Sequence, residues 1–178
     1  MNQCRVLRSR RVLMECVMRL NGELLNTDTL TQVIALMGKS PIHKVWSYSD
    51  VVNIIAPPIQ LGQYITAKNG DEVLGYVCGY VTPEDEKCLL ITEIVVLEAA
   101  RNKGLAGALL ANLAQDWNGI ITTMKTTIVA SNTIAQALFN GYAEKNGHAV
   151  TTEDFITAKD FGKDEKHETE VMYTIAVK

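Results

Sequence analysis

The chain has 178 residues, of which 47% are hydrophobic and 21% are charged. That length supports one sizeable hydrophobic core, so residues 1–178 are expected to form a single soluble α/β domain. The formal net charge of −3 gives no general attraction to phosphate backbones or anionic membranes, which makes nucleic acid an unfavourable partner.

The spacing of cysteines, histidines and apolar runs argues against a metal site, a membrane span and a signal peptide. The four cysteines lie far apart without a C-x-x-C pair, and the three histidines add no ligand spacing, so we expect reduced thiols and no metal. No apolar run reaches the length of about 20 residues that a membrane span needs, and arginines interrupt the first part of the chain. We therefore expect no membrane span, no signal peptide and a cytoplasmic location.

The first part of the chain gives mixed signals. Apolar residues within 6–20 fit either an arginine-bearing helix or a strand, and 1–28 is interpreted as an arginine-rich N-terminal extension. Hydrophobic spacing within 30–37 predicts a helix. The Ser-Pro pair that follows is typical of an N-cap and first turn, which places His43 in the first turn of a further helix.

The middle of the chain is typical of an antiparallel meander that leads into alternating strands and helices. Strands are predicted at 64–67, 73–81, 89–97, 126–130 and 171–177. Helices are predicted at 105–117 and 133–145, the first of them after a loop at 101–107, and a charged loop is predicted near 160–170. The order from the third strand is strand, loop, helix, strand, helix.

The most informative stretch is the loop at 101–107, which joins a strand to a helix. Successive backbone N–H groups in such a loop converge on an anion, and the helix dipole adds its positive end. The small residues of the loop are Gly104, Ala106 and Gly107, and its basic residues are Arg101 and Lys103. Small side chains let a phosphate approach the backbone closely, so the loop is a candidate phosphate site.

Two motifs in this half of the chain resemble those of the GNAT acetyltransferase superfamily. Arg101, Gly104 and Ala106 match its (Gln/Arg)-x-x-Gly-x-(Gly/Ala) loop, and Asn132, Ala135, Leu138 and Gly147 match its Asn-x-x-Ala-x-x-(Leu/Phe) motif and later glycine. The resemblance covers residues 89–147. It implies a single-domain GNAT-like α/β fold, whose mixed, mostly antiparallel central sheet is splayed between its fourth and fifth strands and flanked by helices.

The same resemblance implies a donor and the residues that hold it. The donor is acetyl-CoA or another acyl-CoA, with its thioester between the two splayed strands and its pyrophosphate on the loop. The residues implied to bind it are Val95, Val96, Arg101, Lys103, Gly104, Leu105, Ala106 and Gly107, together with Asn132. No metal or redox cofactor is required.

The chain departs from the GNAT pattern at the residue that usually protonates the departing thiolate. The family places a tyrosine seven residues after the motif asparagine, and this chain has Phe139 there. Tyr142 lies three residues further on and on the same helix face, so it is the candidate general acid.

A second resemblance lies in the first half of the chain. Ser40, Pro41, His43 and Trp46 match the Ser-Pro-x-His-x-x-Trp signature of the toxin-activating lysine acyltransferases that modify RTX toxins. That resemblance implies that His43 and an acidic residue on the central strand, here Glu93, are catalytic.

The chemistry of this pair is suited to acyl transfer. An attacking amine must lose a proton before its nitrogen reaches a thioester carbonyl, and a neutral imidazole such as His43 accepts it. A nearby carboxylate would orient the ring. Backbone N–H groups near Val95 would stabilise the tetrahedral oxyanion.

The leading hypothesis is an enzyme that transfers an acetyl group from acetyl-CoA to a lysine side chain of a protein. The alternatives are fatty-acyl transfer from acyl carrier protein to a protein lysine, acetylation of a small amine such as a polyamine or aminoglycoside, and a catalytically inactive binding or adaptor module. The intact loop at 101–107 favours coenzyme A over acyl carrier protein as the donor. The oligomeric state stays open.

Overall fold

The computed structural model describes residues 5–9, 12–19, 32, 35, 62–69, 72–157, 160 and 168–177. Its strands, in chain order, are β1 (Arg5–Ser9), β2 (Val12–Arg19), β3 (Gly62–Asn69), β4 (Glu72–Thr82), β5 (Asp85–Val96), β6 (Thr123–Val129), β7 (Ala149–Ile156) and β8 (Glu170–Ala176). The helices whose bounds lie within the described residues are the short 3₁₀ helix η2 (Glu98–Ala100) and the α-helices α3 (Leu105–Asp116) and α4 (Thr133–Asn146). The chain forms two compact units, one of residues 1–80 and 93–116 and one of residues 81–92 and 117–178.

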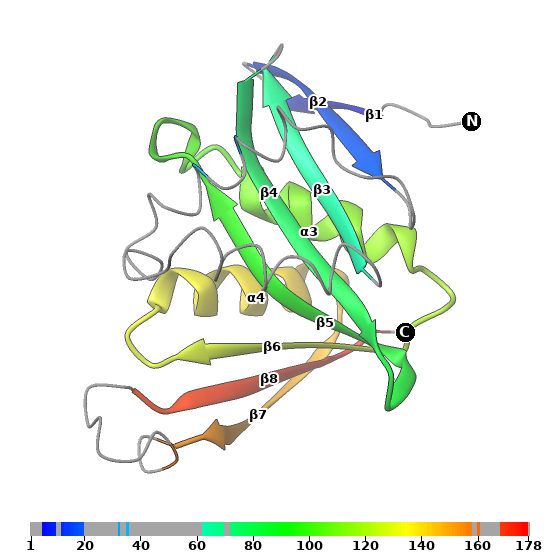
Figure 1. The fold of residues 1–178 in the computed structure, drawn as a ribbon, viewed down its shortest axis with the longest axis vertical. Helices are drawn as coiled ribbons and strands as arrows, with labels where there is room; N and C mark the ends of the chain where they lie inside the picture. Colours follow the sequence, from blue (N-terminus) through cyan, green and yellow to red (C-terminus); the bar gives the residue numbers. More distant parts are fainter. Residues whose placement is uncertain are drawn as a thin grey trace. The chain divides into compact units, whose positions relative to one another are not determined.

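The strands follow the hydrogen-bonded order β1-β2-β3-β4-β5-β6-β8-β7 (Figure 1). β5 and β6 run parallel, whereas the pairs β1–β2, β2–β3, β3–β4, β6–β8 and β7–β8 are antiparallel. The parallel pair needs a crossover connection, which α3 supplies. The expected α/β fold with a mixed, mostly antiparallel sheet and flanking helices is confirmed.

The N-terminal segment forms a hairpin rather than a helix. β1 pairs with β2 from Arg5↔Cys16 to Ser9↔Val12, and β2 pairs in turn with β3. The helical alternative for residues 6–20 is therefore wrong. Pairing with β3, a strand far away in the sequence, decides between two conformations that the local apolar pattern fits equally well.

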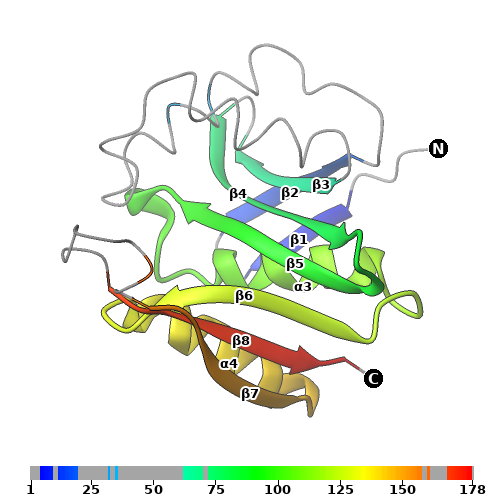
Figure 2. The same ribbon diagram turned by 60° about the horizontal axis from the view of Figure 1, so that its bottom comes forward.

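The core of the first unit lies between α3 and the strands β3 and β4. Leu105, Leu109 and Leu113 recur every four residues along one face of α3 and are at most 2% exposed. This helix packs against β3, on one face of the sheet (Figure 2). In β4 the successive residues from Gly75 to Gly79 are all buried, so both faces of that strand are covered.

The second unit buries one face of β6 and one face of α4. Met124, Thr126 and Ile128 alternate with half-buried neighbours along β6, which is the pattern of a strand with one covered face. In α4 the buried residues Phe139 and Ala143 lie four apart on one face. Figure 2 shows α4 running along the strands of this unit.

Strand β7 was not predicted from the sequence. Its residues Ala149–Ile156 are mostly exposed, and it pairs only with β8 within the described part of the chain. A strand at the end of a sheet whose side chains are mostly exposed has little need for alternating apolar residues, so the sequence carries no period-two signal there. The predicted closing strand is confirmed as β8 and begins one residue earlier than expected.

The remaining predictions fall partly outside the described residues. Gln32 and Ala35 are helical, in agreement with the helix predicted within 30–37. The helix predicted to carry His43 lies outside the described residues. No helix in the described part of the chain is long and apolar enough to span a membrane.

Candidate active site

The candidate donor loop follows directly from the end of β5. The Leu97 amide donates a hydrogen bond of 2.8 Å to the Leu74 carbonyl, which ties the end of β5 to β4. The one-turn helix η2 follows, and at its end the Arg101 amide donates a hydrogen bond of 3.1 Å to the Glu98 carbonyl oxygen. The strand, the tight connection and α3 predicted from the sequence are all present.

The loop reaches α3 through two residues in the left-handed region. Asn102 has φ 59° and Gly104 has φ 77°, and α3 begins at the next residue. Gly104 has no side chain with which to cap the helix, and the first-turn amides of Leu105 to Gly107 have no carbonyl one turn earlier to bond. An exposed loop, amides without intrahelical partners and a helix dipole are the features that anion sites share, and phosphate binding by this loop stays a prediction.

The two basic side chains of the loop hold its backbone. The Arg101 Nε donates to the Val96 carbonyl at 3.1 Å, and the Lys103 Nζ donates to the Ala99 carbonyl at 2.7 Å. Both side chains are exposed. A guanidinium carries five N–H donors, so Arg101 keeps donors for an anion while it fixes the loop to the end of β5.

Glu93 and Tyr76 form a hydrogen bond that was not predicted. The Tyr76 hydroxyl, on β4, donates to the Glu93 Oε2, on β5, at 2.5 Å. The Tyr76 side chain is fully buried, whereas Glu93 is half-buried. The missed signal was the hydroxyl itself, because a tyrosine inside an apolar strand needs a partner for its polar atom.

Val95 and Val96 lie where β5 approaches β4 most closely. A Cβ atom added at Gly75 would lie 2.7 Å from the Val95 carbonyl oxygen and 3.2 Å from the Val96 Cγ2. Only a glycine allows the two backbones to come so close. The strand segment that carries Glu93 is therefore fixed by its neighbour as well as by its own loop.

Asn132 has a structural role in the second unit. It is the N-cap of α4, and its side chain accepts a hydrogen bond of 3.1 Å from the Ala135 amide. The helix ends with Gly147 in the left-handed conformation at φ 68°. Two matched motif positions thus mark the ends of a helix, while donor binding by Asn132 stays a prediction.

Replacing Asn132 with alanine is expected to lower the free energy of unfolding by about 1 kcal/mol, because the Ala135 amide loses its cap. Asn132→Ser is the matched control, since serine caps a helix equally well. Urea denaturation of both variants measures the difference. If Asn132→Ser unfolds like the wild type but has a raised KM for the donor, Asn132 also binds the donor.

Tyr142 lies on α4, close to the start of β7. It is half-buried, and its ring centroid lies 6.0 Å from that of His148. Burial raises the pKa of Tyr142 above its ordinary value of 10.0. The phenol is therefore protonated at neutral pH, as a general acid must be before it donates.

The absorbance of the phenolate is expected to show this raised pKa. In an alkaline titration followed at the tyrosinate absorption band, the difference between wild type and Tyr142→Phe should appear above pH 10.0. The neutral phenol stabilises the fold below that pH, and this contribution is lost as the pH rises through the folded-state pKa. If the absorbance difference between the two proteins appears at or below pH 10.0, burial does not raise the pKa of Tyr142.

The structure brings part of the predicted site together. Glu93, Val95, Val96 and the loop from Arg101 to Gly107 follow one another in the first unit, and Asn132 and Tyr142 belong to the second. His43 lies outside the described residues. The ladder between β5 and β6 joins Cys88–Leu90 to Thr123–Lys125.

The described cysteines lie inside the sheet. Cys78 and Cys88 are both buried, and burial raises the pKa of Cys88. Among the residues that the structure describes, no three histidine, cysteine, aspartate or glutamate side chains gather as metal ligands would.

Curated relatives share a part of this chain. The L-2,4-diaminobutyric acid acetyltransferase of Marinococcus halophilus is 34% identical over 112 residues, which are 62% of this chain and 64% of that protein. The enzyme of the same name from Methylotuvimicrobium alcaliphilum is 37% identical over 116 residues, with the same shares of each chain. The matched part thus spans a little under two-thirds of the length of these relatives.

Solved structures share the fold over nearly the whole chain. The diaminobutyrate acetyltransferase from Paenibacillus lautus, in complex with L-2,4-diaminobutyric acid and coenzyme A, has a TM-score of 0.72 and 22% identity, covering 92% of this chain and 95% of that one. A GNAT family acetyltransferase from Elizabethkingia anophelis with acetyl-CoA bound has a TM-score of 0.62 and 19% identity, covering 92% and 98%.

These comparisons support one of the two resemblances seen in the sequence. The curated relatives named above carry the name of a diaminobutyric acid acetyltransferase and not that of an RTX toxin activator. The signature around His43 therefore gains no support as a mark of toxin-activating acyltransferases. The sequence profile of the acetyltransferase (GNAT) family matches residues 40–142, more than half of the chain. With the strand, loop and helix at the position that this family's motif predicts, the chain belongs to the acetyltransferase (GNAT) family.

Proposed function

We propose that the protein is an N-acetyltransferase that transfers the acetyl group of acetyl-CoA to a primary amine of a small diamino acid, of the class of L-2,4-diaminobutyric acid. The observation that carries the proposal is the uncapped N-terminus of α3 behind the exposed loop from Arg101 to Gly104. Such an end offers several amides and a dipole to the pyrophosphate of coenzyme A.

The acceptor part of the proposal is supported by the relatives. Eight curated relatives that are 29% to 37% identical to the chain carry the same acceptor in their names. The protein-lysine acceptor and the acyl carrier protein donor gain no such support. A small amine, which the sequence left open as an alternative, is therefore the acceptor that we propose.

The proposed reaction forms one bond and breaks one. The neutral acceptor nitrogen attacks the thioester carbonyl carbon, a C–N bond forms, and the C–S bond breaks with its electron pair going to the sulfur of coenzyme A. The proton of the amine passes to a base, and the thiolate takes up a proton from an acid. The backbone amides near Val95 would stabilise the oxyanion between these events.

Two side chains are proposed for the proton transfers and a third for holding the acceptor. Glu93 holds the acceptor amine by its negative charge, and His43 is the candidate base that takes the proton. Tyr142 is the candidate acid for the departing thiolate, because its phenol keeps its proton at neutral pH. Neither His43 nor Tyr142 is required for the donor to bind, so variants of either should affect turnover more than the KM for acetyl-CoA.

The test is a substrate panel with the purified full chain and acetyl-CoA. Release of the coenzyme A thiol is followed with L-2,4-diaminobutyric acid, L-2,3-diaminopropionic acid, L-ornithine, free L-lysine and a lysine-containing peptide. Because one methylene in a binding pocket changes kcat/KM by about 10-fold or more, diaminobutyric acid is expected to exceed lysine by at least about tenfold.

The panel separates the two parts of the proposal. Transfer to the peptide alone would overturn the small-molecule acceptor while leaving the donor intact. Absence of thiol release with every amine, together with absence of acetyl-CoA binding by calorimetry, would overturn the enzyme itself and favour a binding or adaptor module.

A further inference from the structure

We propose that Tyr76 is a positioning residue for Glu93, which holds the carboxylate in the one orientation that serves the acceptor amine. This inference rests on the proposed function, because it assigns Glu93 to the acceptor side of that reaction. Tyr76 itself touches neither substrate in the proposal and acts through Glu93.

The contact between the two side chains is short and joins neighbouring strands. The Tyr76 hydroxyl and the Glu93 Oε2 are 2.5 Å apart. Hydrogen bonds from a hydroxyl to a charged carboxylate lie at about 2.5–2.7 Å and are about twice as strong as those between neutral groups. A contact of this kind determines where the carboxylate lies.

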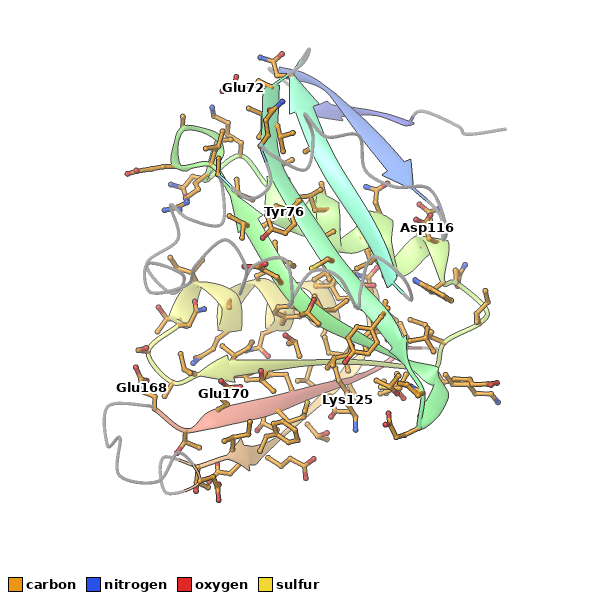
Figure 3. All side chains as sticks on the ribbon, viewed as in Figure 1. Glu72, Tyr76, Asp116, Lys125, Glu168 and Glu170 are labelled. Carbon is orange, nitrogen blue, oxygen red and sulfur yellow. The ribbon has the colours of Figure 1, made fainter. Side chains whose placement is uncertain are left out.

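The two partners are buried to different extents, so the tyrosine fixes the position of the carboxylate and not the reverse. Tyr76 is 0% exposed and lies in a stretch of β4 whose residues are all buried (Figure 3). A phenol ring packed on all sides has one rotamer, so its hydroxyl occupies a fixed point. Glu93 is half-buried, and its flexible side chain takes its position from that fixed point.

The backbone beneath both residues is equally constrained. Gly75, next to Tyr76, lies so close to β5 that an added Cβ would be 2.7 Å from the Val95 carbonyl oxygen. The Leu97 amide bonds to the Leu74 carbonyl on the other side of this close approach. The distance from the Tyr76 ring to the Glu93 backbone is thus set by two rigid strands, which is the support that a precise functional group needs.

A phenylalanine would fill the same buried space without a polar atom to satisfy. In a purely structural role, the Tyr76 hydroxyl would matter for stability and leave catalysis by a folded enzyme unchanged. In the positioning role, loss of the hydroxyl lets the carboxylate rotate away from the amine, and turnover falls in the folded enzyme. A double-mutant cycle separates the two roles.

The cycle uses Tyr76→Phe, Glu93→Gln and the double variant, with Tyr80→Phe on the same strand as the matched control. The measurements are kcat and KM with diaminobutyric acid, the dissociation constant of acetyl-CoA, and the Tm. Tyr76→Phe is expected to lower kcat about tenfold, as small misplacements of a reacting group do, and to leave acetyl-CoA binding unchanged. Tyr80→Phe should keep wild-type kcat.

The decisive result is the effect of Tyr76→Phe in the Glu93→Gln background. There we expect a further loss of less than about twofold, because the group that Tyr76 positions is already gone. An equal loss in both backgrounds, or a wild-type kcat for folded Tyr76→Phe, would overturn the proposal. If Tyr76→Phe fails to fold, Glu93→Asp replaces it, because its carboxylate is one methylene short of the hydroxyl; a wild-type kcat for that variant likewise overturns the proposal.

The activity of the wild-type protein on the amine panel distinguishes a failure of this inference from a failure of the proposed function. If the wild type acetylates another amine of the panel in place of diaminobutyric acid, the proposed acceptor is wrong and the cycle is run with that amine. If the wild type acetylates no amine, both proposals are overturned together.

Discussion

Gly104→Glu is expected to raise the dissociation constant and the KM of acetyl-CoA about a hundredfold, which corresponds to about 2.7 kcal/mol. The new carboxylate would stand at the N-terminus of α3, where it competes with the pyrophosphate for the first-turn amides and repels its charge. Glycine is also the residue best suited to the φ of 77° at this position. Calorimetry with acetyl-CoA and steady-state kinetics measure both constants.

Gly119→Glu is the matched control for this variant. Gly119 has φ 79°, and an added Cβ would meet nothing within 4 Å, as at Gly104. The two variants therefore share the backbone strain and the added charge, and differ only in whether they lie in the donor loop. A similar rise in the dissociation constant for both variants would show that strain or net charge, rather than the phosphate site, is responsible.

Gly75→Ala is expected to lower the free energy of unfolding by about 1–3 kcal/mol, the usual cost of an overpacked core. Its Cβ would lie 2.7 Å from the Val95 carbonyl oxygen and 3.3 Å from the Val96 Cα, and backbone atoms in a sheet cannot rotate away as a side chain can. The two strands must separate locally. Urea denaturation measures the loss, and kcat should fall as well, because Glu93 is carried by the displaced strand.

For Gly141→Ala, the same substitution on α4, we expect the free energy of unfolding to rise instead of fall. Gly141 is exposed on α4, and an added Cβ would meet nothing within 4 Å. Alanine in the interior of a helix is about 0.5–1 kcal/mol more favourable than glycine, so this variant should unfold at a higher urea concentration. Equal stability changes in the two variants would contradict the argument that the gap between β4 and β5 excludes a methyl group.

The strand, loop and helix of the donor site could be predicted because their signals are local. The small residues from Gly104 to Gly107 and the apolar stripe that begins at Leu105 lie within a few turns of one another in the sequence. Their structure depends on φ preferences and helix periodicity, which short segments already express. The predicted helix 105–117 and the observed α3 differ by a single residue at the end.

For residues 6–20 the sequence left helix and strand as alternatives, and β7 was not predicted, because the conformation of these segments depends on their pairing with other strands. Residues 6–20 contain enough apolar side chains for a helix, and only pairing of β2 with β3 makes them strands. In β7 most side chains are exposed, and its hydrogen-bonded neighbour in the described sheet is β8. The apolar pattern of residues 6–20 is ambiguous, and β7 carries no apolar alternation.

The roles of the site residues stay predictions. The resemblance to toxin-activating acyltransferases implied Glu93, but its hydrogen-bond partner was not predicted, because Tyr76 in a run of apolar residues is typical of core packing. The side-chain oxygen of Asn132 proved to be the cap of α4, a role for which asparagine is among the preferred residues. The motifs identified Asn132 and Glu93 as residues, but the hydrogen bonds that their side chains make are known only from the structure.

Strand β8 determines when the second unit can form during synthesis. It lies between β6 and β7 in the hydrogen-bonded order, and it pairs with both of them from Glu170 to Ala176. The chain is synthesised from its N-terminus, so β6 and β7 leave the ribosome before β8. Until β8 follows, the backbone groups with which β6 and β7 pair to β8 have no partner strand. The sheet of this unit is therefore complete only after β8 has been synthesised, and until then the edge of β6 that β8 later covers is open to pairing with other chains.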